Sequence, residues 1–227
     1  DSLLSVIIKD EWQSESDIEL EQLHSRISFV FRLWGCGRKK SYVFKAFVRS
    51  ISVGDFATIE NRLSRQKLSH CLLSKFSIPF GNTNFYCFEG LQQITRQKAK
   101  ECLFSLVQGV HAAIDELHEH GGMAHLDIRL PNLCFRKVDE TNCSVVLIDL
   151  ERAKRDIYSP WNGDYESCMY KKGFNLKQID YLQLYWMAVW ILSYPAGLDY
   201  HRMDLETEFK DLKDEKCKGL CKTISQF

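Results

Sequence analysis

The sequence lacks an excess of charge of either sign, and it lacks any long hydrophobic run. Its 227 residues carry 30 Lys and Arg against 30 Asp and Glu, so no bulk positive field exists to drive non-specific binding to nucleic acid or to anionic membranes. The longest apolar run, residues 184–192, is far shorter than the ~20 residues of a membrane-spanning helix. We therefore expect no nucleic-acid partner and no membrane partner, and any phosphate site must be local.

The residues that are present suit a folded protein. Apolar residues make up 45% and aromatic residues 12% of the chain, which is too much for a disordered one. The nine cysteines are odd in number and scattered, several of them inside apolar segments, which predicts reduced, buried thiols and an intracellular protein, cytoplasmic or nuclear. The chain opens at Asp1 rather than Met, which leaves room for an upstream domain.

The first ninety residues predict a small sheet that carries one helix. Four β-like runs alternate polar and apolar positions: 27–34, 41–48, 72–80 and 84–88. The first pair flanks a glycine-containing turn and the second pair flanks Gly81-Asn82, so each pair predicts a hairpin. Between the pairs, apolar residues recur at helical spacing from Phe56 to Leu63, with Asp55 available as an N-cap.

After Gly90 the pattern becomes mainly helical. Apolar residues follow a 3.6-residue period at Leu103, Leu106, Val107, Val110, Ile114 and Leu117. This long helix should end at Gly121-Gly122. Its three histidines, His111, His118 and His120, lack partners at ligand spacing and are expected to pack or to lie at the surface.

Further along, two short apolar runs, 133–136 and 145–148, predict a buried hairpin, and residues 179–194 are apolar on nearly every face of a helix. These patterns predict an α+β fold with two lobes. We place the boundary near Gly90, with residues 1–90 as the N-lobe, a small sheet plus one helix, and residues 91–227 as a helical C-lobe.

Three polar side chains stand at strand and loop ends of the second lobe. Asp127 and Asn132 belong to the segment 125–132, and Asp149 directly follows an apolar strand. Neither carboxylate has a cation beside it in sequence, and two carboxylates brought together repel unless a divalent ion or a substrate hydroxyl lies between them. Mg²⁺ accepts carboxylate, amide, water and phosphate oxygens. The pattern therefore predicts a site for Mg²⁺ and a nucleotide.

The run His-x-Asp-x-Arg-x-x-Asn, followed by apolar-Ile-Asp, resembles the catalytic loop and metal-binding strand of the protein-kinase-like superfamily. The order of helix, loop, hairpin, Asp and buried helix matches that family's larger lobe over about residues 95–194. The motif His-x-Asp-Ile-Arg-x-x-Asn is also similar to that of kinase-like domains of the crinkler effector and mobile-element families. The resemblance implies a two-lobed kinase-like fold, here with a reduced N-lobe and a shortened C-lobe.

The resemblance also implies a role for each matching residue. Asp127 would accept the proton of the attacking hydroxyl. Arg129 would steady the transferred phosphoryl group, or else pair with a carboxylate of the loop. Asn132 and Asp149 would hold Mg²⁺. Asp180 resembles the family's carboxylate that anchors the backbone of the catalytic loop.

In the smaller lobe that family pairs a strand lysine with a helix glutamate, so that the lysine is held against the nucleotide phosphates. Lys45 lies in a predicted strand, and Glu60 is the only carboxylate between Asp55 and Glu89. We therefore expect Lys45 and Glu60 to pair. The backbone groups around Glu89 and Leu91 would meet the adenine ring of ATP.

The sequence departs from the family pattern at three places. No Gly-x-Gly-x-x-Gly precedes Lys45, so the usual cover over the phosphates is not expected. Leu126 stands where many regulated protein kinases carry Arg, which argues against control by a phosphorylated activation loop. Asp149-Leu150-Glu151 replaces Asp-Phe-Gly, and its acidic third residue resembles the choline-kinase and aminoglycoside-phosphotransferase branch. Glu151 could hold metal or water, or could pair with a nearby arginine.

The resulting hypothesis is an ATP-dependent phosphotransferase with ATP and Mg²⁺ as cofactors and a hydroxyl acceptor as partner. A protein Ser or Thr is the first choice of acceptor. A small molecule is the second, because of Glu151 and the short stretch after residue 194. A different class, a pseudokinase that binds or scaffolds without turnover, is favoured by the missing glycine-rich motif and by Leu126.

Overall fold

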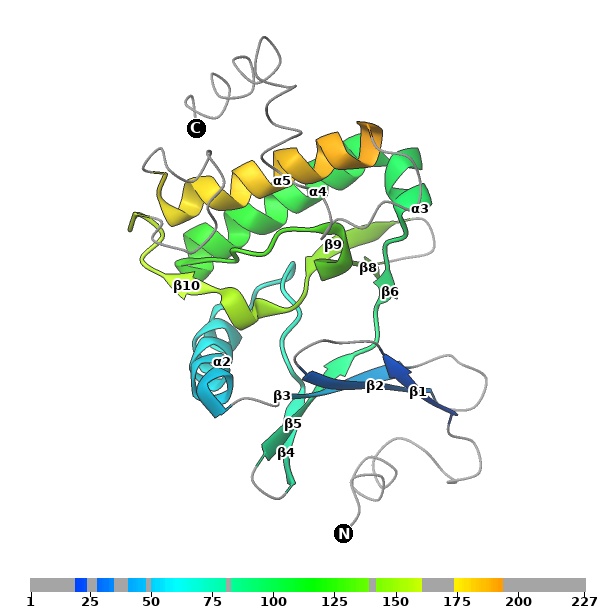
Figure 1. Ribbon diagram of the computed structural model, residues 1–227, viewed down its shortest axis with the longest axis vertical. Helices are drawn as coiled ribbons and strands as arrows, with labels where there is room; N and C mark the ends of the chain where they lie inside the picture. The colour runs from blue at the N-terminus through cyan, green and yellow to red at the C-terminus, as the bar shows by residue number, and fades with distance from the viewer. Residues whose placement is uncertain are drawn as a thin grey trace. The chain divides into compact units, whose positions relative to one another are not determined.

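The computed structural model describes residues 19–23, 28–34, 41–47, 50–80, 83–138, 142–160 and 174–193 (Figure 1). Its N-terminal part is a five-stranded antiparallel sheet in the order β1-β2-β3-β5-β4. The strands are β1 (Glu19–Leu23), β2 (Ser28–Trp34), β3 (Ser41–Phe47), β4 (Phe76–Phe80) and β5 (Thr83–Glu89). The two expected hairpins are present as β2–β3 and β4–β5, and β1 adds an edge strand.

The second hairpin is shorter than expected at its start. Its first strand was predicted from Leu72, whereas β4 begins at Phe76. Lys75 still donates its backbone N–H to the Cys87 carbonyl oxygen at 2.7 Å. Ser74 before it turns to the neighbouring helix, where its backbone N–H donates to a carboxylate oxygen of Glu60 at 2.7 Å. The predicted turns at 35–40 and 81–82 lie outside the described residues.

The helix of this part, α2 (Ser50–Leu63), also differs from the prediction at its start. Asp55 was expected to cap the helix, but it lies inside it. One internal glycine costs a helix only about 1 kcal/mol, so Gly54 does not stop it. The predicted apolar face is correct, because Phe56, Ile59 and Leu63 are all buried.

The sheet has two different faces. One carries an apolar cluster formed by Leu33, Tyr42, Phe44 and Cys87, with Phe31, Ile78 and Phe85 packed against it. Helix α2 packs on the other face, where the Phe56 ring meets the Tyr86 ring edge-on at 4.9 Å between centroids. Since side chains alternate along a strand, Lys45 shares the helix-covered face with Tyr86, its direct cross-strand partner.

The described residues of the C-terminal part form three helices and several short strands. The helices are α3 (Arg96–Glu101), α4 (Leu103–Glu116) and α5 (Leu176–Ser193). The strands are β6 (Gln92–Gln93), β7 (Met123–Ala124), β8 (Leu133–Lys137), β9 (Cys143–Leu147) and β10 (Lys154–Arg155). They form one sheet in the order β6-β8-β9 and a second from β10 and β7. The antiparallel β8–β9 pair is the buried hairpin that the sequence predicts.

The predicted long helix is present as α4, which starts at Leu103, and the separate short helix α3 precedes it. The Thr95 side chain caps α3 by accepting the backbone N–H of Lys98, and the chain bends at Cys102 before α4 begins. Beyond α4, a π-helical turn over Leu117–Gly121 ends at Gly122, whose positive φ of 61° suits a residue without Cβ. The predicted stop at the two glycines is therefore confirmed.

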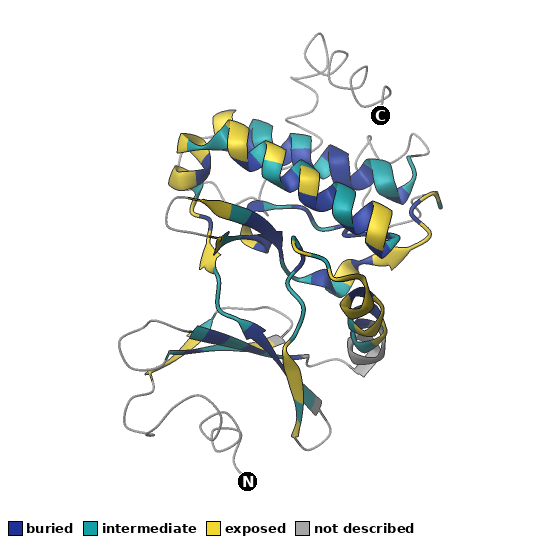
Figure 2. Ribbon diagram, turned by 180° about the vertical axis from the view of Figure 1, so that it is seen from behind, coloured by how far each residue is buried: buried dark blue, intermediate teal, exposed yellow. Residues whose placement is uncertain are grey.

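Helix α5 begins before the predicted residue 179, because the sequence around residue 175 forms a cap. The Asn175 side chain accepts the backbone N–H of Gln178 at 2.9 Å, and the Gln178 side chain accepts the backbone N–H of Asn175 at 3.0 Å. These reciprocal bonds satisfy donors at the helix start. The buried positions of α5, which include Trp186 and Trp190, are drawn dark blue in Figure 2.

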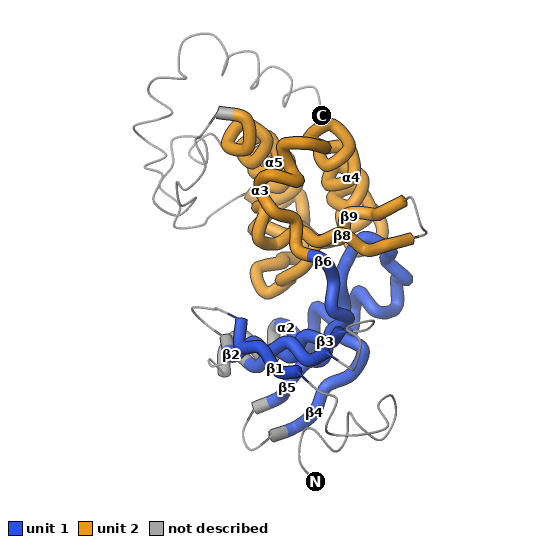
Figure 3. The backbone as a smooth tube through the Cα atoms, turned by 90° about the vertical axis from the view of Figure 1, so that its right-hand side faces the viewer, with its two compact units in different colours: residues 1–92 blue, residues 93–227 orange. Residues whose placement is uncertain are grey.

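The elements group into two compact units, residues 1–92 and 93–227 (Figure 3). The division falls between Gln92 and Gln93, whereas the predicted boundary lies near Gly90. Among the described cysteines, Cys71, Cys87 and Cys134 are buried, but Cys102 is half-buried and Cys143 is exposed, contrary to the expectation that all are buried. Across the described residues, no helix has both the length and the apolar character needed to cross a membrane.

Candidate active site

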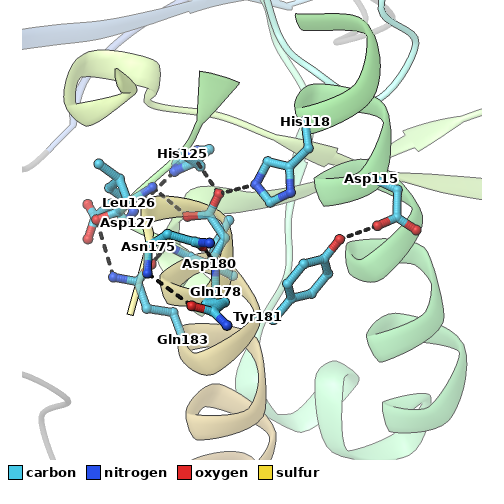
Figure 4. Close-up of polar contacts among 11 residues, drawn as sticks. Asp115, His118, His125, Leu126, Asp127, Asn175, Gln178, Asp180, Tyr181 and Gln183 are labelled. Carbon is cyan, nitrogen blue, oxygen red and sulfur yellow. Dashed lines mark hydrogen bonds and ion pairs between the residues drawn. The ribbon is translucent and has the colours of Figure 1, made fainter. Parts of the chain in front are cut away.

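The segment 125–132 is held in place by α5. It follows β7 and ends in a short 3-10 turn, Leu130–Asn132, directly before β8. The Asp180 carboxylate accepts the backbone N–H of His125 at 2.8 Å and that of Leu126 at 2.7 Å (Figure 4). Asp180 is fully buried, so these bonds are shielded from water. They are the geometry expected of a carboxylate that anchors this loop.

The loop backbone is strained at Leu126. Its φ is 63°, in the left-handed region, which costs roughly 1–3 kcal/mol for a residue with a bulky side chain. Two side chains of α5 hold Leu126 there. Asp180 accepts its N–H, and Gln183 Nε2 donates to its carbonyl oxygen at 3.3 Å. Gln183 Oε1 also accepts the N–H of Ile128 at 2.9 Å.

Sequence-based prediction did not indicate that His118 and Gln183 help to hold this loop. His118 was expected to pack or to lie at the surface, yet its Nε2 lies 2.8 Å from Asp180 Oδ2 and both side chains are fully buried. A signal for His118 was available, because it follows Leu117 on the buried side of the helix and a polar group there needs a polar partner. Gln183 lies three residues after Asp180, so both face the same way on α5.

Asp127 lies with its carboxylate between Asn132 and Arg129. Its Oδ2 accepts a hydrogen bond from Asn132 Nδ2 at 2.8 Å and lies 3.1 Å from an Arg129 guanidinium nitrogen. Asn132 Nδ2 also donates to the Asp127 carbonyl oxygen at 2.9 Å, so both of its N–H groups are used on Asp127. Of the two interpretations of Arg129, the ion pair within the loop is observed, and its contact with a phosphoryl group stays a prediction.

Asn132 and Asp149 lie at the same end of the β8–β9 hairpin. Leu133 and Leu147 are partners in its register, and the next residue, Ile148, donates its N–H to the Asn132 carbonyl oxygen at 3.0 Å. Asp149 therefore directly follows a residue that is hydrogen-bonded to Asn132. The backbone brings together the two residues to which the family resemblance gives the role of holding Mg²⁺.

The residues around Asp149 fix its backbone. Its φ is 66°, a left-handed conformation that aspartate tolerates better than most residues. Leu150, which is buried, and Glu151 then form a 3-10 turn over Leu150–Arg152. On the other side, His125 Nε2 lies 3.0 Å from the Ile148 carbonyl oxygen, which ties the segment 125–132 to the strand leading into Asp149.

The side-chain oxygen atoms near this end of the hairpin are suitable ligands for Mg²⁺. Within the described ranges, no three or more His, Cys, Asp or Glu side chains form a group able to hold a metal ion alone. Mg²⁺ needs no such group, because it binds through one or two carboxylates together with waters and substrate phosphates. A carboxylate from Asp149 and the amide oxygen of Asn132 are hard oxygen ligands of this kind. Asn132 is buried and its amide nitrogen faces Asp127, which orients the amide.

In the N-terminal unit, Lys45 and Glu60 both lie near Tyr86. Lys45 is the cross-strand partner of Tyr86, and the charge of Glu60, together with burial as the larger effect, raises the pKa of the Tyr86 phenol. The Glu60 carboxylate itself accepts the backbone N–H and the hydroxyl hydrogen of Ser74. The two predicted partners thus share one face of the sheet, while Ser74 is the observed hydrogen-bond partner of Glu60.

Burial controls the titration of Glu60. Desolvation raises the pKa of its carboxyl above the ordinary 4.5, and the two bonds from Ser74 lower it by less. An ammonium group next to this carboxylate would lower its pKa further. The Lys45–Glu60 ion pair itself stays a prediction.

The residues expected at the adenine ring lie where β5 ends. Glu89 closes β5 opposite Tyr42, and the Gly90 N–H donates to the Ser41 carbonyl oxygen at 2.7 Å. A Cβ atom on Gly90 would meet Ser41 Oγ at 1.9 Å, so this close approach requires glycine. Leu91 follows as a half-buried residue. Their contact with a nucleotide stays a prediction.

A second polar network joins α4 to α5. The Tyr181 hydroxyl donates to Asp115 (Figure 4). The other carboxylate oxygen of Asp115 lies 3.0 Å from His111 Nδ1. Burial raises the pKa of the Tyr181 phenol, and the hydrogen bond to Asp115 raises it further, so the phenol stays protonated and donates. The network fixes the helix that carries Asp180.

No family model matches the sequence, and no curated protein matches it. The structure is similar to the solved structure of the Cydia pomonella granulovirus kinase PK-1, with a TM-score of 0.57 and 16% sequence identity. The similarity covers 92% of this chain and 84% of that chain. The chain therefore has an α+β protein-kinase-like fold, as the sequence predicts. The finer resemblances to crinkler-type domains and to choline kinases stay predictions.

Proposed function

We propose that this chain is an ATP-dependent phosphotransferase that moves the γ-phosphoryl group of Mg-ATP to a hydroxyl. The observation that carries the proposal is the arrangement at the end of the β8–β9 hairpin. There, Asp127 is hydrogen-bonded to Asn132, and Asn132 is hydrogen-bonded through its backbone to the residue before Asp149. The kinase-like fold supports the same assignment.

Asp127 would act as the base. Among the described residues, the side-chain contacts of Asp127 with Asn132 and Arg129 both fall on Oδ2, so we assign Oδ1 to the incoming hydroxyl. As the hydroxyl oxygen bonds to the γ-phosphorus, its proton passes to Asp127. The bond from that phosphorus to the bridging oxygen breaks, and ADP leaves. Arg129 would keep Asp127 oriented and offer its remaining N–H groups to the phosphoryl oxygens.

Asn132 and Asp149 would hold Mg²⁺, which when bound neutralises charge on the phosphate oxygens. Because the amide nitrogen of Asn132 is engaged by Asp127, its amide oxygen is the atom assigned to the ion. Lys45 would bind the α- and β-phosphates, oriented by Glu60, and the backbone around Glu89 and Leu91 would bind the adenine. Positioning and charge neutralisation would supply most of the rate acceleration.

We propose a Ser or Thr hydroxyl of a protein as the acceptor. A small-molecule alcohol is the second candidate, because Glu151 stands in a turn directly after Asp149, where an acidic residue adds a further oxygen ligand for metal or water. A pseudokinase is the competing class. It would bind nucleotide without transferring phosphate.

The test is transfer of labelled phosphate from ATP to general protein substrates, to aminoglycosides, to choline-like alcohols and to the chain itself. We expect Asp127→Asn to abolish transfer and to leave thermal stability nearly unchanged, since the amide fills the same space. Unchanged labelling in that variant would remove the base assignment. Stabilisation by Mg-ATP without transfer to any acceptor would identify a pseudokinase.

A further inference from the structure

Gln183 holds the backbone on both sides of Asp127. Its Oε1 accepts the N–H of Ile128 at 2.9 Å, and its Nε2 donates to the carbonyl oxygen of Leu126 at 3.3 Å. The first group belongs to the peptide plane that follows Asp127 and the second to the plane that precedes it. One side chain therefore fixes both planes.

The direction of the Asp127 side chain depends on these two planes. A residue has only two soft backbone dihedrals, and they lie between the planes on its two sides. When both planes are held, the Cα–Cβ direction is set and the carboxylate has only its own side-chain torsions left. The preceding residue, Leu126, is in a strained left-handed conformation, so this part of the loop would relax if it were released.

Asp180 cannot supply this restraint alone. Its carboxylate binds the N–H groups of His125 and Leu126, which both precede Asp127. Among the described contacts of α5 with the loop, the bond that follows Asp127 in sequence comes from Gln183. The two side chains stand three residues apart on one face of the helix, so together they hold the loop on either side of Asp127.

We infer that Gln183 is a positioning residue for phosphoryl transfer: it orients Asp127 by clamping the peptide groups on both sides of it. This inference rests on the proposed function, in which Asp127 is the base. Gln183 does not touch substrate in this scheme. It acts on turnover through Asp127 and not on nucleotide binding.

Three variants test the inference. Gln183→Met keeps the length of the side chain and removes both hydrogen bonds. Gln183→Glu keeps the acceptor for Ile128 and loses the donor to Leu126. Gln178→Met is the matched control, because Gln178 lies on the same helix but bonds to Asn175 at the helix start and not to the loop.

Two measurements are made on each variant: steady-state transfer kinetics, and hydrogen exchange of the Ile128 amide by NMR. In Gln183→Met we expect kcat to fall about tenfold to a hundredfold, the scale for a misplaced catalytic group, with KM for ATP unchanged. The Ile128 amide should exchange roughly tenfold faster, because it has lost one hydrogen bond. Gln183→Glu should recover part of the amide protection, and Gln178→Met should match the native chain in both measurements.

Unchanged exchange at Ile128 in Gln183→Met would overturn the inference, and so would faster exchange without a change in kcat. An equal loss of kcat in Gln178→Met would also overturn it, because the effect would then come from the helix as a whole. If the native chain transfers no phosphate, the proposed function fails, and the exchange comparison still decides whether Gln183 orders the loop.

Discussion

His118 and Asp180 form a fully buried pair, with His118 Nε2 2.8 Å from Asp180 Oδ2. The same oxygen accepts the backbone N–H of His125, so the turn after α4, the start of the loop and α5 meet at one carboxylate. His118 Nδ1 is buried and has no hydrogen-bond partner in the part of the chain that the structure describes. The pair is thus connected to the loop on one side only, through Asp180.

We predict that His118→Leu destabilises the protein strongly. Leucine fills a similar space but leaves the buried Asp180 with two backbone N–H groups and no side-chain partner, a loss of about 3 kcal/mol on the scale of broken buried pairs. The measurement is the free energy of unfolding in urea. Tyr181→Phe is the control: it removes a hydrogen bond to the partly exposed Asp115 and should cost about 1 kcal/mol. Equal losses of unfolding free energy in the two variants would contradict a larger contribution from the buried pair.

The sequence was sufficient to predict most of the described part of the second unit, because the polar residues of the site stand next to strong apolar patterns. Asp127 and Asn132 lie between the predicted helix and the predicted hairpin, and Asp149 lies just after a strand. Once the strands pair in register, Asn132 and Asp149 must lie close together. The local sequence pattern and the tertiary structure agree here, so few other arrangements of these residues are compatible with the sequence.

The features that the sequence did not predict depend mostly on contacts between residues distant in sequence. Ser74 bonds to Glu60 across 14 positions, and Gln183 bonds to Ile128 across 55. Neither bond has a periodicity or a motif from which it could be predicted, since a Ser or a Gln makes similar bonds in many settings. The early start of α2 was missed for a different reason: packing of the helix on the sheet outweighs the small intrinsic cost of Gly54.

Glu60 should make the folded protein less stable as pH rises. Burial raises the pKa of its carboxyl above 4.5 in the folded protein, so the folded state binds this proton more tightly than the unfolded state does. Stability from this group is therefore greatest below pH 4.5 and falls as pH rises through the folded pKa. In Glu60→Gln this fall should be absent.

The measurement is the free energy of unfolding of the native chain and of Glu60→Gln across pH 4 to 8. The difference between them should change in favour of the variant as pH rises above about 4.5, and then level off. Glu101→Gln, on the exposed side of α3, controls for the lost negative charge. A difference that does not change with pH would contradict the effect of burial on Glu60.

Gly109 should resist substitution although it lies inside a helix. A Cβ atom there would lie 2.6 Å from Cγ2 of Val145 and 3.2 Å from its Cβ, where α4 packs on β9. Alanine normally gains about 1 kcal/mol over glycine in a helix. Overpacking costs typically 1–3 kcal/mol, and a β-branched valine cannot rotate away easily, so we expect a net loss in Gly109→Ala of about 1 kcal/mol.

A double-mutant cycle with Val145→Ala checks this assignment. In the double variant the two methyl groups no longer meet, so the cost of Gly109→Ala should disappear or change sign. The coupling energy from denaturant unfolding should be about 1 kcal/mol or more, as for residues in direct contact. Additive effects would show that the loss has another cause.

Lys45 should contribute to nucleotide binding rather than to stability. It stands on the face of the sheet that α2 covers, half-buried, opposite Tyr86. If its ammonium binds phosphate, Lys45→Met should weaken binding of Mg-ATP about tenfold or more, because a hydrogen bond to a charged group contributes about 1.5–3 kcal/mol. Calorimetric titration of ATP, with and without Mg²⁺, measures this directly.

Lys75→Met is the matched control for that titration. Lys75 lies in the same unit, exposed, with its ammonium 5.0 Å from the centre of the Tyr42 ring on the opposite face of the sheet. Because it is on the other face, its loss should leave the affinity for Mg-ATP unchanged. A lower melting temperature in Lys45→Met with native affinity would make Lys45 a structural residue, and the phosphates would then need another cation.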